Sequence, residues 1–179
     1  VNSLLQLSRV DSKELALHRE TVEFTTFFLE IIERFEMNVK EEQSIAFERV
    51  IPDESYYVWI DRDRMTQVID NIISNAIKYS PNGGKITFKI EKRIRQIVIS
   101  VKDEGIGIEY DQLDKIFDRF YRVDKARTRE LGGTGLGLAI TRELVEAHYG
   151  RIWANSRVGE GTTIYFTLPL MNEMRRRTV

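Results

Sequence analysis

The chain has 179 residues, 42% of them hydrophobic, no cysteine and a formal net charge of −1. This length suits one domain with a good core plus an appendage, and the balanced charge gives no sign of binding to nucleic acid or to a membrane surface. Disulfides and thiolate chemistry are excluded, no apolar run approaches the roughly 20 residues of a membrane span, and no signal peptide opens the chain.

The N-terminal part of the chain predicts one amphipathic helix. The chain starts at Val1 rather than at a methionine, so we expect a fragment of a longer protein, and residues 1–14 resemble the end of a helix whose partner is missing. Residues 16–23 predict an extended polar connector. Residues 22–40 predict a long helix with apolar side chains at helical spacing. Its inward face would consist of Phe24, Phe27, Phe28, Ile31, Ile32 and Phe35.

Two short strands come next. Residues 45–50 and 57–60 carry β-branched and aromatic side chains, and they lie on either side of a turn at Pro52-Asp53. Asp61 or Asp63 then provides the N-cap of the following helix, because an aspartate oxygen accepts hydrogen bonds from the free N–H groups of a first turn.

The stretch from Asp63 to Pro81 predicts a helix with an unusual polar face. Gln67, Asn71, Asn75 and Lys78 line that face, so it carries amides and a lysine rather than mixed charges. An amide oxygen is a neutral, hard ligand for Mg²⁺, and a lysine ammonium suits a phosphate. Taken alone, the same face could be an ordinary solvated surface. The apolar face consists of Met65, Val68, Ile69, Ile72, Ile73 and Ala76.

Two alternating strands follow the end of this helix. Pro81 ends the helix, and Asn82-Gly83-Gly84 supplies a turn. One apolar face per strand predicts a sheet that helices cover on one side only. The inward residues would be Ile86, Phe88, Ile90, Ile97, Ile99 and Val101, and the solvent-side residues Thr87, Lys89, Ser100 and Lys102.

The remaining elements are predicted from shorter patterns. We expect a short helix at residues 112–118 that continues to 122, followed by a mobile loop at 123–133. A second helix should run from 133 to His148 and end at Gly150. Strands at 151–156 and 162–169 should flank a turn at 159–161, and the polar tail from Met171 should be frayed.

Most of the eleven glycines fall in three clusters. Gly105 and Gly107 follow Asp103 at a strand end, where glycine lets a flat ligand approach the backbone and the acid accepts a hydrogen bond from an exocyclic amine. The cluster at 133–137 precedes a helix, whose free N–H groups suit a phosphate. The cluster at 159–161 could be purely structural. A single cluster is weak evidence, but together with the amide helix these features predict a nucleotide–Mg²⁺ site.

In this order, the motifs resemble those of sensor histidine kinases. Residues 71–81 resemble the N box, 103–107 the first glycine box, 117–122 the F box, 133–138 the second glycine box and 159–162 a third. The match covers about residues 20–169, and the boxes in this order are highly specific. The run at 117–129 resembles in particular the sensor kinases that govern cell-wall metabolism in Gram-positive bacteria.

The resemblance implies the Bergerat ATP-binding fold. This fold is an α+β, two-layer sandwich in which helices cover one face of a mixed, mostly antiparallel sheet. By this resemblance, ATP would lie between the helix predicted at 63–81 and the second glycine box. Residues 1–20 would then be the end of a dimerisation and phosphoacceptor helix with its connector, residues 21–170 the catalytic ATP-binding domain, and residues 171–179 a flexible tail.

The resemblance also assigns roles to individual residues. Asn75 would ligate Mg²⁺, and Asn71 would support the metal or the phosphates. Lys78 and Arg122 would contact phosphates, and these four residues would be catalytic. Residues 122–133 would form a lid over ATP. The full nucleotide-binding set would be Asn71, Asn75, Lys78, Tyr79 near the nucleotide, Asp103 on the adenine amine, Gly105, Gly107, Ile108, Arg122, Gly133, Thr134, Gly135, Leu136, Gly137, Leu138 and Thr162.

The implied activity is transfer of the γ-phosphoryl group of ATP to a histidine on a dimerisation module that this chain lacks. The two histidines present, His18 and His148, lack the Ser-His-Glu context of the family's phosphoacceptor. We therefore expect both to be structural or solvent-facing. Partners would be that module and, through the full kinase, a response regulator, without nucleic acid or direct membrane contact. The location would be the cytoplasmic part of a membrane-anchored bacterial sensor kinase.

Two alternatives use the same fold. ATP hydrolases such as type II topoisomerases, mismatch-repair proteins and a chaperone place a water-activating glutamate one helical turn before the metal asparagine. That position is Asn71 here, and the adjacent Asp70 points about 100° away around the helix. The second alternative is a nucleotide-binding module that catalyses no reaction. The presence of both Lys78 and Arg122, the cations that would reach the phosphates, argues against this alternative.

Overall fold

The computed structural model describes residues 16–119, 121 and 137–171. The predictions for residues 1–14, for the loop at 123–133, for the first residues of the second glycine box and for the tail beyond Met171 lie outside the described residues. Among the described helices, none has both the length and the apolar composition that crossing a membrane requires.

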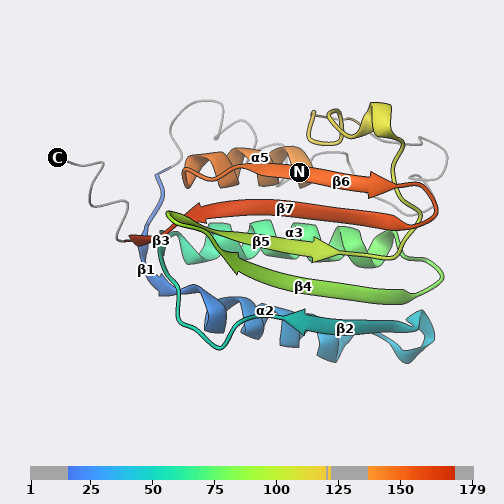
Figure 1. The fold of residues 1–179 in the computed structure, drawn as a ribbon, viewed down its shortest axis with the longest axis horizontal. Coiled ribbons are helices and arrows are strands. Elements are labelled where there is room, and N and C mark those ends of the chain that lie inside the picture. Colours follow the sequence, from blue (N-terminus) through green and yellow to red (C-terminus); the bar gives the residue numbers. More distant parts are fainter. Residues whose placement is uncertain (1–15, 120, 122–136, 172–179) are drawn as a thin grey trace.

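The fold has two layers, as predicted (Figure 1). Five strands form one sheet in the order β2-β4-β5-β7-β6, with β2 parallel to β4 and the other neighbours antiparallel. The described helices all lie on the same face of this sheet. The strands are β2 (Ile45–Val50), β4 (Gly84–Lys92), β5 (Gln96–Lys102), β6 (Ile152–Arg157) and β7 (Gly161–Pro169), and the helices are α2 (Phe24–Asn38), α3 (Arg62–Lys78) and α5 (Gly137–Ala147).

A second, two-stranded sheet joins the predicted connector to the body. The connector is extended, as expected, and part of it forms β1 (Glu20–Glu23), which pairs antiparallel with β3 (Tyr57–Ile60). The strands β2 and β3, which flank the turn at Pro52-Asp53, therefore belong to different sheets. Strand partners are chosen by long-range contacts, so the local pattern predicted both strands without indicating how they pair.

The core lies between α2, α3 and the inner face of the sheet. The predicted apolar face of α3 is buried throughout, since each of its six residues is at most 4% exposed. The aromatic residues of α2 extend this core to the sheet, because Phe28 stacks on Phe24 at 5.6 Å and meets Phe88 of β4 edge-on at 6.0 Å. Phe35 packs at the margin of the core and is only half-buried.

The two ends of α3 follow from its sequence. Asp61, rather than Asp63, is the N-cap, and its carboxylate accepts a hydrogen bond from the backbone N–H of Arg64 at 3.1 Å. The helix ends at Lys78, before Pro81, with Tyr79 as its C-cap. Gly83 then donates its N–H to the carbonyl of Ser80 at 3.0 Å, which closes the predicted turn into β4.

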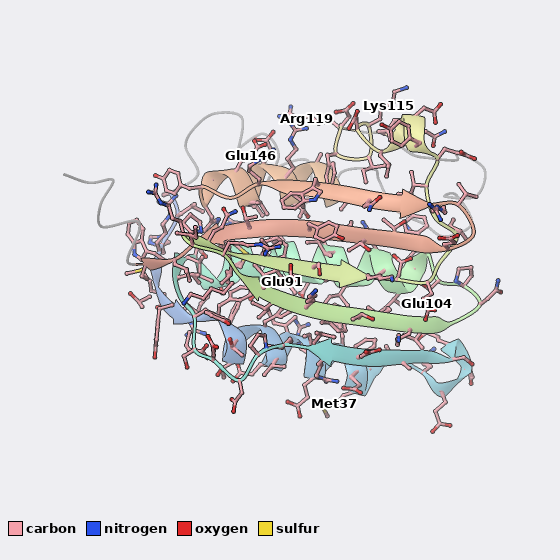
Figure 2. The ribbon with its side chains drawn as sticks, viewed as in Figure 1. Met37, Glu91, Glu104, Lys115, Arg119 and Glu146 are labelled. Carbon is pink, nitrogen blue, oxygen red and sulfur yellow. The ribbon has the colours of Figure 1, made fainter. Side chains whose placement is uncertain are left out.

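The predicted α-helix at residues 112–118 is wrong. A 3₁₀ turn, η2 (Tyr110–Gln112), is followed by turns in which Lys115 N donates to Gln112 O at 3.0 Å and Asp118 N to Lys115 O at 2.9 Å. Only Ile116 and Phe117 are buried in this segment, so it has too short an apolar face to stabilise an α-helix by packing. Figure 2 shows the side chains of Lys115 and Arg119 at the outer edge of the molecule.

One residue predicted on the solvent side of the sheet is buried. Ser100 is 8% exposed because it lies on the central strand β5, between Lys89 of β4 and Tyr165 of β7. Tyr165 in turn stacks on Trp153 at 5.3 Å. Large side chains on neighbouring strands therefore cover a small residue even on the face without helices.

Candidate functional site

The middle of α3 contacts the start of α5. The Asn71 side-chain amide donates to the carbonyl of Gly137 at 3.3 Å and to the Thr141 hydroxyl at 3.2 Å. That hydroxyl donates to the same carbonyl at 2.7 Å, and Thr141 is fully buried. Sequence analysis did not single out Thr141, although it follows the glycine-rich segment by one helical turn. The contact brings the predicted metal-binding helix and the predicted phosphate-binding helix together.

The polar stripe of α3 borders this contact. Gln67, Asn71, Asn75 and Lys78 are all half-buried, not fully solvated. Within the described part of the chain, no hydrogen bond reaches the side chain of Asn75. The Lys78 ammonium lies 5.4 Å from the ring centroid of Tyr79. The stripe therefore lies at a margin between helices, where an amide oxygen and a cation can meet a ligand.

Asp103 lies at the end of β5 and is 6% exposed. Its Oδ1 accepts the backbone N–H of Gly105 at 2.9 Å and that of Thr162 at 3.1 Å. Burial raises the pKa of Asp103 to about 6, although the two N–H bonds oppose that rise. Among the described residues no hydrogen bond reaches Oδ2, so this oxygen is available to an incoming donor.

Two glycines around Asp103 are required by close backbone packing. A Cβ on Gly105 would overlap the carbonyl of Tyr79, which accepts the Ile106 N–H at 3.1 Å. Gly161 has φ +118°, and its Cβ would overlap the carbonyl of Asp103. We expected glycine here to let a ligand approach. The Cβ direction of Gly105 faces the chain's own backbone, and the close contact joins the end of α3 to the loop after β5; the approach of a ligand stays a prediction.

The rest of the first glycine box packs on the turn between β6 and β7. A Cβ on Gly107, at φ +74°, would overlap the carbonyl of Arg157. The Ile108 N–H donates to the Ser156 hydroxyl at 2.8 Å, and that hydroxyl lies 2.7 Å from the Thr162 hydroxyl. Ser156 is a site-supporting residue that sequence analysis missed, because nothing local distinguishes it from other strand serines.

The structure thus brings most of the described candidates together around α3. Its middle contacts Gly137, and its end contacts the loop that carries Asp103. Leu138 differs from the other candidates because its side chain packs, half-buried, against the hydrophobic core. Arg122, Gly133, Thr134, Gly135 and Leu136 lie outside the described residues.

No histidine, cysteine or carboxylate cluster of three or more is arranged to hold a metal ion in the described part of the chain. The expected Mg²⁺ ligands are amides instead. A neutral amide oxygen on the half-buried Asn75 has the donor chemistry that Mg²⁺ takes in proteins.

The two histidines have structural surroundings. His148 is 1% exposed; its Nδ1 donates to the Leu144 carbonyl at 2.7 Å, and its Nε2 accepts the Asp61 N–H at 3.1 Å. Burial lowers the pKa of His148 below 6.5, and the nearby Arg19 adds to that effect. His18 is exposed, and its backbone N–H donates to Asp61. His148 is structural and His18 faces solvent, as the sequence predicted.

Comparisons with known proteins show similarity over most of the chain. Residues 60–172 match the family described as histidine kinase-, DNA gyrase B-, and HSP90-like ATPase. The chain is 58% identical over 175 residues to the sensor histidine kinase WalK of Bacillus subtilis (strain 168), covering 97% of this chain and 28% of that protein. It therefore spans little more than a quarter of the length of this relative.

Solved structures show the same fold. The crystal structure of full-length ShkA in complex with AMPPNP aligns with a TM-score of 0.81 at 24% identity, over 94% of this chain and 35% of that one. A nucleotide-free catalytic domain of histidine kinase ThkA aligns with a TM-score of 0.73 at 29% identity, over 86% of this chain and 98% of that one. The predicted resemblance to sensor histidine kinases is confirmed, and the chain belongs to the family of histidine kinase-, DNA gyrase B- and HSP90-like ATPases.

Proposed function

We propose that this chain is the ATP-binding catalytic domain of a sensor histidine kinase. It would hold ATP and Mg²⁺ for transfer of the γ-phosphoryl group to a histidine on a dimerisation module. The observation that carries the proposal is Asp103, a buried carboxylate whose Oδ1 is saturated by Gly105 and Thr162 and whose Oδ2 takes no hydrogen bond from the described residues.

An adenine fits this carboxylate. Two backbone N–H groups fix the plane of the Asp103 carboxylate, so Oδ2 is held ready to accept a hydrogen bond from the exocyclic amine. Guanine presents a carbonyl oxygen at the equivalent position, and two acceptors would then face each other. Tyr79, whose carbonyl is fixed to the same loop, lies near the base in this arrangement.

The phosphates and the metal fit the polar side of α3 and the start of α5. Asn75 would ligate Mg²⁺, Lys78 would contact phosphates, and Asn71 would hold Gly137 in place beside them. Among the described residues, a Cβ on Gly137 would meet no atom within 4 Å. When bound, Mg²⁺ would neutralise charge on the phosphates during transfer. Arg122 and the segment at 133–136 complete the proposed binding set.

Transfer to a protein side chain is favoured over hydrolysis. Asn71 occupies the helical position from which a glutamate would activate water, and its amide is bonded to Gly137 and Thr141. The adjacent carboxylate, Asp70, is paired with Arg34 of α2 at 2.6 Å and so lies on another side of the helix. An amide cannot act as a general base, and Asp70 is directed away from the site.

The wider assignments follow from the relatives and are part of the proposal. The phosphoacceptor would lie on the dimerisation module, the catalytic domain would comprise residues 21–170, and residues 1–20 and 171–179 would be a connecting helix and a tail. A response regulator would receive the phosphoryl group from the full kinase. The domain would lie on the cytoplasmic side of a membrane-anchored sensor.

Calorimetry and labelling together test the function. The chain should bind ATP with Mg²⁺ clearly more tightly than GTP. With labelled ATP it should neither label itself nor release phosphate appreciably, but it should slowly label a separately supplied dimerisation module. Joining the two pieces should accelerate labelling, because it raises their effective concentration towards the millimolar range. Brisk phosphate release by the chain alone would favour a hydrolase instead.

A further inference from the structure

Residues 18–23, here called the strap, pack against β3 and the start of α3, at the side away from the proposed nucleotide site. Glu20–Glu23 pairs with β3 in a short antiparallel sheet. Just before it, the His18 N–H donates to Asp61 Oδ2 at 2.9 Å, and Glu20 pairs with Arg62 at the start of α3. The strap is therefore fixed to the N-terminal end of α3.

Arg19 extends the strap to the C-terminal end of α5. Its Nη2 donates to the carbonyl of Ala147 at 2.6 Å. Its guanidinium carbon lies 5.4 Å from the ring centroid of Trp59 and 5.4 Å from that of Tyr149. A cation at the negative end of a helix, between two aromatic rings, gains both from the helix dipole and from the ring quadrupoles.

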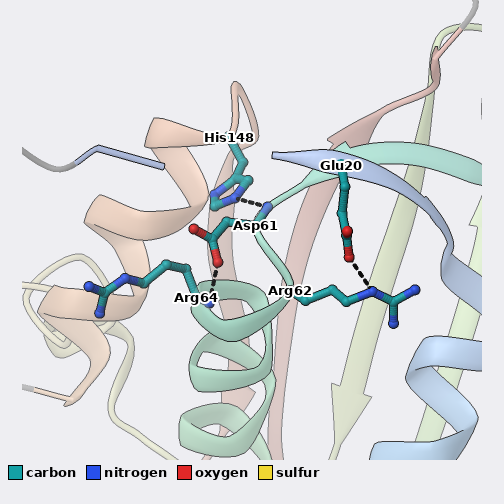
Figure 3. Close-up of polar contacts among 5 residues, drawn as sticks. All are labelled: Glu20, Asp61, Arg62, Arg64 and His148. Atoms are coloured by element: carbon teal, nitrogen blue, oxygen red, sulfur yellow. Dashed lines mark hydrogen bonds and ion pairs between the residues drawn. The ribbon is translucent and has the colours of Figure 1, made fainter. Parts of the chain in front are cut away.

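The same ends of α3 and α5 are also tied directly (Figure 3). The backbone N–H of Asp61 donates to Nε2 of His148 at 3.1 Å, and Nδ1 of His148 donates to the Leu144 carbonyl at 2.7 Å. Asp61 thus receives the strap on its carboxylate and binds α5 through its backbone. Burial alone would raise the pKa of Asp61, but the N–H groups of Arg64 and His18 and the nearby His148 hold it below its ordinary value.

The two helices are therefore joined at two levels. The Asp61–His148 tie and Arg19 join the end beside the strap, and the Asn71 amide joins α3 to Gly137 beside the nucleotide site. Asn71 follows Asp61 by ten positions, which is about 15 Å along a helix. Both helices are continuous between these levels, so a shift of α5 at one end must displace the other end.

We propose that closure of the strap is thermodynamically coupled to nucleotide binding, with Arg19 as the positioning residue. Nucleotide binding would stabilise the closed strap, and the closed strap would strengthen nucleotide binding by the same factor, because coupling free energies are reciprocal. Loss of the Arg19 contacts would therefore weaken nucleotide binding. This inference rests on the proposed function, since it places the nucleotide between α3 and the start of α5. The coupling would connect the residues before the strap to the proposed ATP site.

The test compares three forms of the whole chain: the unmodified protein, Arg19→Met and Arg49→Met. Arg19→Met keeps the length of the side chain but removes its charge and its bond to Ala147. Arg49→Met is the matched control, because it removes an arginine and its exposed pair with Glu36 of α2 without touching the strap or α5. Calorimetry with a non-hydrolysable ATP analogue and Mg²⁺ should show binding weaker by roughly fivefold or more for Arg19→Met, and unchanged binding for Arg49→Met.

Amide hydrogen exchange supplies a second readout that does not depend on activity. In the unmodified protein, the analogue should slow exchange in residues 18–23, and in Arg19→Met this protection should be lost. Equal affinity of Arg19→Met and the unmodified protein would overturn the coupling and leave the nucleotide function intact. No binding to the unmodified protein would overturn both. Should melting show that Arg19→Met is unfolded, Trp59→Leu removes one wall of the Arg19 contact and should show the same loss.

Discussion

Asp103 and Thr162 hold each other through a reciprocal pair of hydrogen bonds. The Asp103 N–H donates to the Thr162 carbonyl at 2.8 Å, and the Thr162 N–H donates to Asp103 Oδ1 at 3.1 Å. The pair fixes a buried carboxylate at the junction of β5 and β7 and leaves its other oxygen without a hydrogen bond from the described residues. Such a group costs folding free energy when ionised and is retained where function needs it.

Asp103→Asn should increase the stability of the fold and weaken the binding of ATP. An asparagine oxygen can still accept the N–H groups of Gly105 and Thr162, but it carries no buried charge. Because the pKa of Asp103 is raised from 3.8 to about 6, the variant should be more stable at pH 8 by on the order of 1–3 kcal/mol. It should also bind ATP more weakly and discriminate less against GTP. Urea unfolding and calorimetry measure the two effects, and tighter ATP binding would contradict the adenine role.

Nucleotide affinity should depend on pH through the same group. With a pKa of about 6, Asp103 is ionised at pH 7 and mostly protonated at pH 5.5. If only the carboxylate accepts the adenine amine, affinity should fall roughly fourfold over that range. Asp103→Asn provides the reference, because titration of the phosphates affects both proteins equally. An identical pH profile in the two proteins would show that Asp103 does not contact the base.

Asn75→Ala should remove Mg²⁺-dependent binding without harming the fold. The side chain is half-buried on the polar face of α3, so its truncation leaves no core cavity. Affinity for ATP measured with Mg²⁺ should fall by more than tenfold, on the scale of at least 1.4 kcal/mol, and should approach the affinity measured without metal. Asn155→Ala, on the exposed side of β6, is the matched control and should bind normally. Unchanged metal dependence in Asn75→Ala would remove Asn75 from the metal site.

Asn71→Asp should be less stable than Asn71→Ala. The amide of Asn71 donates to the Gly137 carbonyl and to the Thr141 hydroxyl, whose own proton is already directed to Gly137. A carboxylate there would face acceptors, at a cost of about 1–3 kcal/mol, whereas alanine only removes the bonds. Thermal melting should order the variants with Asn71→Asp lowest, at about 2–4 °C for each kcal/mol. The reverse order would mean that Asn71 does not donate to α5.

His148 should make the protein less stable in mild acid. Its folded pKa lies below 6.5, so the unfolded chain takes up a proton first as the pH falls. The stability that neutral His148 contributes is full above about pH 7 and declines as the pH falls through 6.5 towards the folded pKa. The charged groups that face it are Asp61, which stays ionised in this range, and Arg19.

The measurement for His148 compares the unmodified protein with His148→Gln by urea unfolding at pH 7.5 and 5.5. Glutamine can still accept the Asp61 N–H but does not titrate. The difference in unfolding free energy between the two proteins should therefore shrink at pH 5.5. Taking this difference cancels the opposite contribution of Asp103, whose protonation in the same range favours folding. A difference that does not vary with pH would show that His148 keeps its ordinary pKa.

Local patterns predicted much of the fold. The apolar face of α3 and the inward residues of β4 and β5 were identified residue by residue, because burial repeats with the helical or strand period. The N-cap of α3 was narrowed to Asp61 or Asp63, because an aspartate oxygen there can accept hydrogen bonds from the free N–H groups of the first turn. The prediction failed at residues 112–118, where a few apolar residues permit either an α-helix or successive turns and packing selects the turns.

Periodicity and the fixed order of the motifs were enough to predict most of the elements, the fold class and the family, and the segment at 112–118 is the exception. The pairing of the strands, the need for the glycines and the role of His148 depend instead on contacts that form in the folded structure. Gly105 and Gly161 are required by backbone atoms distant in sequence, and His148 meets Asp61 across 87 positions of the chain. A local pattern carries no information about such contacts, because they exist only once the core has brought the segments together.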